Sequence, residues 1–128
     1  MSIDLKLLVW SAALTFVQML IAVFGSILQV GLPTLAGNRD KLAMIEGWAG
    51  RAQRAHDNML ESLVLFAVLV LVAQASGSAN AMTALGAQLF FWARVAYTAI
   101  YIAGVQWVRT AVWSVSVIGL LLIFFQLV

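Results

Sequence analysis

Several kinds of residue are scarce in this chain of 128 residues. It has no cysteine, one proline and 9% charged residues. The lack of cysteine excludes disulfides, thiolate metal sites and cysteine nucleophiles. Soluble domains have a charged fraction of about 25%, whereas 64% of this chain is hydrophobic. This composition excludes a soluble globular protein and indicates a membrane protein.

The remaining composition excludes other classes. The formal net charge of +2 is too small to indicate nucleic-acid binding, so no nucleic acid is expected as a partner. His56 has no second histidine or cysteine nearby, so no metal site is predicted. No long polar stretch remains to build a soluble module beside the apolar segments. We therefore expect residues 1–128 to form a single membrane domain.

Four apolar runs predict four membrane-spanning helices. Their approximate bounds are 7–35, 57–75, 81–103 and 110–128. The first run is longer than the apolar core of a secretory signal peptide, which has about 7–15 residues, so we expect it to be retained. Short connections after the second and third runs favour antiparallel neighbours. The predicted fold class is all-α, an integral membrane four-helix antiparallel bundle.

Basic residues gather in two of the three connections. The first and last connections hold five of them: Arg39, Lys41, Arg51, Arg54 and Arg109. The turn at 76–80 has none. The positive-inside rule therefore places both basic connections on the cytoplasmic side of the membrane and both termini on the opposite side.

A polar stripe leads into the second apolar run. At about 100° per residue, four polar side chains share one helix face: Arg51, Arg54, Asn58 and Glu61. Burying such groups at the rim of a bilayer is costly unless they meet one another or a charged ligand. A zwitterionic ligand with carboxylates and an amine would satisfy them. A polar lock that only sets the register of two helices would do so as well.

A second polar group lies inside the third apolar run. Arg94, Tyr97 and Tyr101 are spaced i, i+3 and i+7, so they share a helix face. An arginine at this depth must face protein, water or a carboxylate, and Glu61 is the nearest candidate if the two helices pack together. Arg94 is therefore either a structural partner or a ligand contact. With Arg109 about two turns further on, the two faces predict a site for a peptide ligand.

These two groups resemble the motifs of a known family. Residues 54–61, Arg-Ala-His-Asp-Asn-Met-Leu-Glu, resemble the second-helix Arg-x-x-x-Asn-x-x-Glu motif of the membrane-associated proteins in eicosanoid and glutathione metabolism, the MAPEG family. Residues 94–101, Arg-Val-Ala-Tyr-Thr-Ala-Ile-Tyr, look like its third-helix motif. The resemblance covers all four predicted spans and is closest to short bacterial members that are similar to microsomal glutathione transferases. It implies a homotrimer in the bacterial inner membrane, with three glutathione sites between neighbouring subunits.

The resemblance also implies roles for single residues in binding glutathione. The implied contacts are Arg51, Arg54, Asn58, Glu61, Tyr97, Tyr101 and, from the adjacent subunit, Arg39. Arg54 would pair with a carboxylate of the ligand, because guanidinium groups bind carboxylates in a bidentate way. Asn58 would bond to the peptide, and Glu61 would hold the amine or a neighbouring arginine. Arg94 would support the site.

Arg109 resembles the arginine that lies near the glutathione sulfur in the family. A cation there favours thiolate over thiol, which raises the concentration of the nucleophile at neutral pH. The implied activity is a membrane glutathione transferase, which joins its cosubstrate glutathione to lipophilic electrophiles from the bilayer. Glutathione-dependent reduction of lipid hydroperoxides is a variant of the same chemistry. Ser62 stands where some eicosanoid-synthesising relatives have tyrosine, so the lipid substrate stays open.

Two other functions are compatible with a small polytopic membrane protein. A noncatalytic relative would bind lipid and present it to a partner, and it would need neither Arg109 nor the polar stripe. A four-span transporter would need a lone embedded acid as its coupling site, whereas Glu61 has arginines on its own helix face. The set of arginines therefore favours an enzyme.

Overall fold

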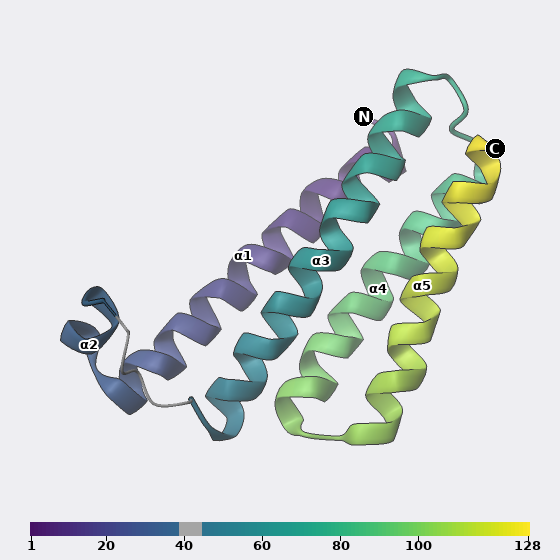
Figure 1. Cartoon of the computed structure of the whole chain (residues 1–128). Helices are drawn as coiled ribbons and strands as arrows, with labels where there is room; N and C mark the ends of the chain where they lie inside the picture. The colour runs from purple at the N-terminus through teal and green to yellow at the C-terminus, as the bar shows by residue number, and fades with distance from the viewer. Residues whose placement is uncertain (39–44) are drawn as a thin grey trace.

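The computed structural model describes residues 1–38 and 45–128, so Arg39 and Lys41 lie outside the described residues. The described chain is all-helical, which confirms the predicted class. Its helices are α1 (Ile3–Val30), α2 (Leu32–Ala36), α3 (Gly47–Ala75), α4 (Ala81–Ala103) and α5 (Gln106–Leu127). The long helices α1, α3, α4 and α5 lie side by side and alternate in direction (Figure 1).

Three of the described helices, α1, α3 and α5, are long and apolar enough to cross a membrane. Helix α4 has the expected bounds and a length of 23 residues, but Gln88 and Arg94 interrupt its apolar sequence. It packs against all three of the other long helices, which shelters polar groups from lipid. A membrane span at α4 thus stays a prediction.

The first apolar run is not one continuous helix. Helix α1 ends at Gly31, which has φ 83° and whose N–H bonds to the carbonyl of Ile27 at 2.9 Å. Glycine adopts a positive φ at little cost. Pro33 then lies in the first turn of α2, where its missing N–H removes no helical hydrogen bond. The segment predicted as the end of the first span therefore folds as a separate short helix.

The ends of α4 are also marked in the sequence. Asn80 and Thr83 form a capping box, in which each side chain accepts a hydrogen bond from the other residue's backbone N–H. At the other end, Gly104 has φ 86° and its N–H bonds to the carbonyl of Ile100 at 3.1 Å. The tight turn there brings α5 back beside α4, so Arg109 lies near the end of α4 that carries Tyr101.

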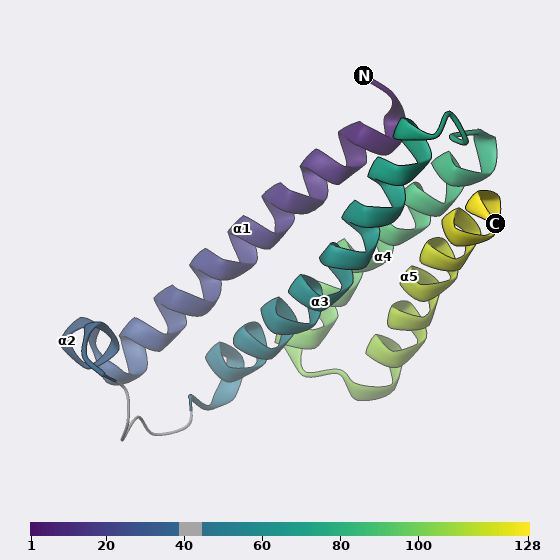
Figure 2. The ribbon, with the colours of Figure 1, turned by 45° about the horizontal axis from the view of Figure 1, so that its top comes forward.

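The core lies between the four long helices, α1, α3, α4 and α5. Phe66 of α3 and Phe90 of α4 stack with ring centroids 4.2 Å apart. Helices α4 and α5 lie in close contact at Gly86 and Gly119, where a Cβ on either glycine would lie 2.6 Å from the other's carbonyl oxygen. Small residues permit such close backbone contact between membrane helices. Figure 2 shows α1 and α5 at opposite edges of this arrangement, with α3 and α4 between them.

Candidate functional site

The guanidinium of Arg94 is completely buried in the middle of α4. Its Nη2 donates a hydrogen bond to Oδ1 of Asn58 on α3 at 2.8 Å, and the group lies 4.2 Å from the centroid of the Tyr97 ring. The expectation that Glu61 would be its partner is wrong. The crossing of the two helices places Asn58 at the level of Arg94, whereas Glu61, almost one turn further along α3, is exposed.

A small polar cavity lies between three helices. Its volume is about 180 Å³, and its walls are Asn58 of α3, Tyr97 of α4, and Arg109, Thr110 and Trp113 of α5. The structure thus brings Asn58, from the polar stripe of the second run, and Tyr97, from the polar residues of the third run, together with Arg109. These side chains offer an amide, two hydroxyl groups, an indole N–H and a guanidinium, so the walls are rich in hydrogen-bond donors.

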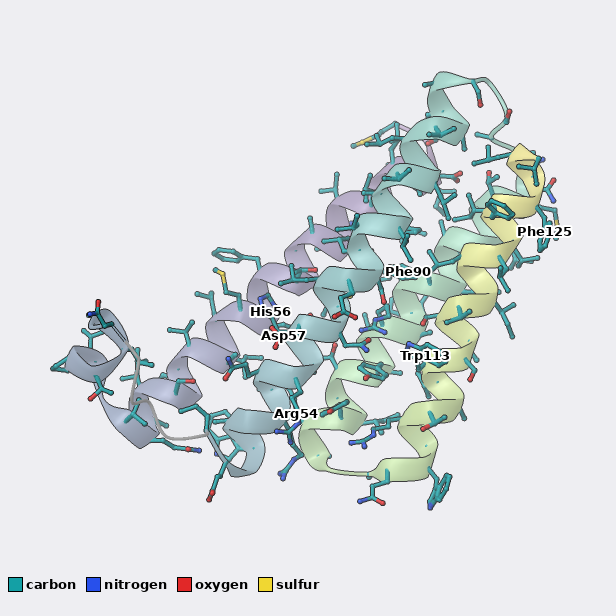
Figure 3. The ribbon with its side chains drawn as sticks, viewed as in Figure 1. Arg54, His56, Asp57, Phe90, Trp113 and Phe125 are labelled. Carbon is teal, nitrogen blue, oxygen red and sulfur yellow. The ribbon has the colours of Figure 1, made fainter. Side chains whose placement is uncertain are left out.

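Tyr101 gathers two arginines from different helices. Nε of Arg54 donates to the Tyr101 hydroxyl at 3.3 Å, and the guanidinium of Arg109 lies 4.5 Å from the centroid of the same ring. Figure 3 shows Arg54 near the lower end of α3 and Trp113 on α5, with α4 between them. The positive charges of Arg54 and Arg109 are therefore held near one face of α4, close to the polar cavity.

Arg51 has a structural partner of its own. Its Nε donates to the carbonyl of Ile102 at 2.9 Å. That carbonyl belongs to the last turn of α4, where backbone oxygens lack helical partners and a cation is favoured. Arg51 therefore helps to end α4, and a contact between Arg51 and a ligand stays a prediction.

The arginines around this site lack carboxylate partners in the part of the chain that the structure describes. Within residues 1–38 and 45–128, none of the arginines forms an ion pair with a carboxylate. Arg94 even keeps two N–H groups, at Nε and Nη1, that are buried without a hydrogen-bond partner. Uncompensated guanidinium groups at this depth are costly. The site is therefore electrostatically suited to an anionic ligand.

A larger apolar groove adjoins the polar cavity. It has a volume of about 640 Å³, lies between α3 and α5, and shares Asn58 and Trp113 with the polar cavity. Glu61 and Ser62 line its polar end, and the rest of its wall consists of Leu65, Val68, Leu69, Val117, Leu120, Leu121 and Phe124. A lipophilic molecule in this groove would have one end beside the donors of the polar cavity.

Four residues around the site were not singled out in the sequence. Thr110 and Trp113 line the polar cavity, and Gln18 and Thr98 belong to a buried hydrogen-bond network beside it. Trp113 and Thr98 each lie four residues after an arginine of the site, so helical spacing placed them on the right faces. Gln18 was the clearest missed signal, because a glutamine inside an apolar span needs a polar partner.

His56 faces a different part of the molecule. With Asp57 and Gln53 it lines a cavity of about 370 Å³ formed by α1, α2 and α3, and its Nδ1 is buried without a partner. Figure 3 shows His56 and Asp57 on the side of α3 that faces α1. In the part of the chain that the structure describes, no group of three or more acidic or histidine residues could hold a metal ion.

The apolar helices and the donor-lined cavity between three of them define an integral membrane protein with a polar site. The chain belongs to the MAPEG family, whose model matches residues 6–128, nearly its whole length. Comparison with curated proteins and with solved structures gave no match. The family includes glutathione transferases and peroxidases as well as noncatalytic members.

Proposed function

We propose that this protein is a membrane glutathione transferase. The observation that carries the proposal is the junction of two spaces at Asn58 and Trp113. A donor-lined cavity that contains Arg109 adjoins a long apolar groove. An anionic thiol and a lipophilic electrophile would meet at that junction, and holding two reactants in contact is a large source of catalysis.

The arginines without carboxylate partners are the reason for proposing glutathione as the ligand. This tripeptide carries two carboxylates, an amine and a thiol. Arg54, with Arg51 beside it, would bind the carboxylates, and Glu61 would hold the amine. Asn58 would bond to the peptide, and Tyr97 and Tyr101 would line it. No described carboxylate pairs with these arginines, so an anionic ligand would relieve an existing charge imbalance.

Arg109 is the proposed catalytic residue. Its guanidinium would stabilise the glutathione thiolate after the thiol proton leaves to water. The sulfur lone pair then forms a carbon–sulfur bond, and either a leaving group departs with its bonding electrons or the electrons of a double bond shift to the neighbouring carbon and are protonated. With a lipid hydroperoxide, the same thiolate would attack the terminal peroxide oxygen, the O–O bond would break, and the lipid alkoxide would leave and take up a proton. A second glutathione would then reduce the resulting sulfenic acid, giving glutathione disulfide and water. Neither route needs a metal or a covalent enzyme intermediate.

The size of the cavity supports a site shared between subunits. Ligand pockets are usually about 300–1,000 Å³, whereas the polar cavity of one chain is about 180 Å³. A neighbouring copy would complete it, in a homotrimer of four-helix bundles where Arg39 comes from the adjacent subunit. Large apolar side chains on the outer faces, Trp10, Phe16, Phe24 and Trp92 among them, are exposed and would contact lipid or another copy.

The proposed orientation follows from the end of the molecule at which the arginines lie. Arg51, Arg54 and Arg109 lie where α3 and α5 begin, and the termini lie at the other end (Figure 1). The positive-inside rule makes the arginine end cytoplasmic. Glutathione would then enter from the cytoplasm, and the electrophile from the bilayer, with the bacterial inner membrane as the proposed location.

One observation favours a second candidate, a noncatalytic lipid-binding protein. The apolar groove is more than three times as large as the polar cavity, and a lipid carrier would need only the groove. Such a protein would have no use for a guanidinium at the polar end. The effect of replacing Arg109 therefore separates the two functions.

The test is a titration of the purified protein in detergent with glutathione, while the ultraviolet absorbance of the thiolate is followed. We expect saturable binding and thiolate formation. Arg54→Ala should weaken binding about tenfold or more, because it removes a charge-assisted hydrogen bond. Arg109→Ala should retain binding, abolish the thiolate signal and lower kcat about 10²-fold. Lys6→Ala, which removes one exposed positive charge near the start of α1, is the matched control.

The outcomes distinguish the candidates. No detectable glutathione binding would overturn the transferase proposal. Lipid binding without any effect of glutathione would favour the noncatalytic carrier. An unchanged thiolate signal in Arg109→Ala would leave the glutathione site in place and remove Arg109 from the mechanism.

A further inference from the structure

A chain of buried hydrogen bonds crosses three helices and ends at the site. Nε2 of Gln18 on α1 donates to the hydroxyl of Thr98 on α4. That hydroxyl donates to the backbone carbonyl of Arg94 at 2.8 Å. The guanidinium of Arg94 donates in turn to Oδ1 of Asn58 on α3 at 2.8 Å. Gln18, Thr98 and Arg94 are all buried, so water does not compete with these bonds.

The chemistry of the groups gives this chain a direction. A guanidinium has only donors, so the amide atom of Asn58 that faces Arg94 must be its oxygen. The single hydroxyl proton of Thr98 is used on the Arg94 carbonyl, so Thr98 can only accept from Gln18. Each group therefore donates toward the next, from α1 through α4 to α3.

The direction determines what Asn58 can offer a ligand. The oxygen of the amide accepts from the guanidinium of Arg94, which turns the NH₂ group away from Arg94. That group has no partner among the described residues, and Asn58 lines both the polar cavity and the apolar groove. Asn58 therefore presents the N–H donors of its amide, beside the guanidinium of Arg109 and the indole N–H of Trp113. A hydrogen-bond acceptor on the ligand fits this point.

We propose that Gln18 and Thr98 are positioning residues, which act through Arg94 to fix the amide of Asn58 as a donor toward a carbonyl or carboxylate of the bound peptide. This proposal rests on the proposed function, because glutathione is the peptide. Helix α1 contributes no side chain to the polar cavity. It would nonetheless set the affinity of the site through this network.

The network also explains why Arg94 needs support from outside its own helix. Two of its donor groups, Nε and Nη1, are buried without a partner, and so is Oε1 of Gln18. A guanidinium held by one side-chain hydrogen bond has other orientations available. The bond from Gln18 ties the turn of α4 that carries Thr98 and Arg94 to α1, which limits movement of the arginine relative to Asn58.

The experiment compares two threonines that differ in one respect. Thr98 and Thr15 are both buried, and each donates to the carbonyl four residues earlier in its own helix. Only Thr98 also accepts from Gln18. We would measure KM for glutathione, kcat and thermal stability for Thr98→Val, Gln18→Leu and Thr15→Val, with Thr98→Ser as the conservative variant.

Thr98→Val and Gln18→Leu should each raise KM for glutathione about threefold to tenfold with little change in kcat, because they disturb a contact made equally before and during the reaction. Thr15→Val should leave KM unchanged, and Thr98→Ser should restore it. In an Asn58→Ala background, Thr98→Val and Gln18→Leu should cause no further rise in KM for glutathione, because the amide that the network positions is absent. If the rise in KM came from a general loss of packing, it would also be seen in the Asn58→Ala background.

Two results would overturn the proposal. Equal KM values for Thr98→Val, Gln18→Leu and Thr15→Val would show that the network does not act on the site. A penalty for Thr98→Val that persists in Asn58→Ala would assign it to packing. In contrast, failure of the unsubstituted protein to bind glutathione would overturn the proposed function itself.

Discussion

The guanidinium of Arg109 lies over the aromatic ring of Tyr101, 4.5 Å from its centroid. Arg109 comes from the first turn of α5, and Tyr101 from the last turn of α4, so the contact spans the tight turn at Gly104. The face of an aromatic ring attracts a cation. The ring thus helps to place the proposed catalytic charge beside the polar cavity.

This relationship leads to a graded prediction for Tyr101. Tyr101→Leu removes the ring and should lower the thiolate signal with glutathione about twofold to thirtyfold, corresponding to a cation–π contribution of about 0.5–2 kcal/mol. Tyr101→Phe keeps the ring and loses only the hydroxyl that accepts from Arg54. It should therefore retain the thiolate signal and weaken glutathione binding. Equal effects of the two variants would show that the hydroxyl, not the ring, is what matters.

The apolar groove should determine the range of electrophiles. Val68→Trp places a large side chain in the groove and should lower turnover of a long-chain electrophile about tenfold or more. Glutathione binding should not change, because the polar cavity is left intact. Val64→Trp is the matched control, since Val64 is also exposed on α3 but does not line the groove. If both variants lose the same activity, the groove is not the binding site of the electrophile.

Close contact between α4 and α5 should make Gly86 sensitive to a single methyl group. A Cβ at Gly86 would meet the carbonyl oxygen of Gly119 at 2.6 Å. Overpacking of this kind costs about 1–3 kcal/mol, so Gly86→Ala should lower Tm in detergent. Gly37→Ala is the control, because its nearest neighbours would lie at 3.6 and 3.7 Å. An unchanged Tm for Gly86→Ala would contradict the close approach of the two helices.

The absence of cysteine permits a direct test of orientation. Ala79→Cys labels the turn between α3 and α4, and Gln106→Cys labels the start of α5. A thiol reagent that cannot cross the membrane should modify residue 106 only from the cytoplasmic side and residue 79 only from the opposite side. Labelling of both positions from the same side would show that α4, the helix between them, does not cross the membrane.

Much of the fold follows from local sequence. Long apolar runs predict the helices, because a backbone in lipid must satisfy its hydrogen bonds internally. Gly31, Asn80 and Gly104 explain where helices end or begin. Local pattern did not show that the first apolar run divides at Gly31. The helical spacing of the polar stripe did extend the second helix back to Arg51, and α3 begins slightly earlier still, at Gly47. Polar residues there extend the helix beyond the region that hydropathy detects.

The candidate site, too, was predictable from the sequence only in part. Helical spacing alone grouped Arg54 with Asn58, and Arg94 with Tyr97 and Tyr101, because residues three and four apart share a face. Which groups meet across helices was decided only by the tertiary structure. Spacing favoured Glu61 as the partner of Arg94, but the crossing of α3 and α4 places Asn58 there instead. The partnership of Gln18 with Thr98, residues that are 80 positions apart, likewise depends on how α1 packs against α4.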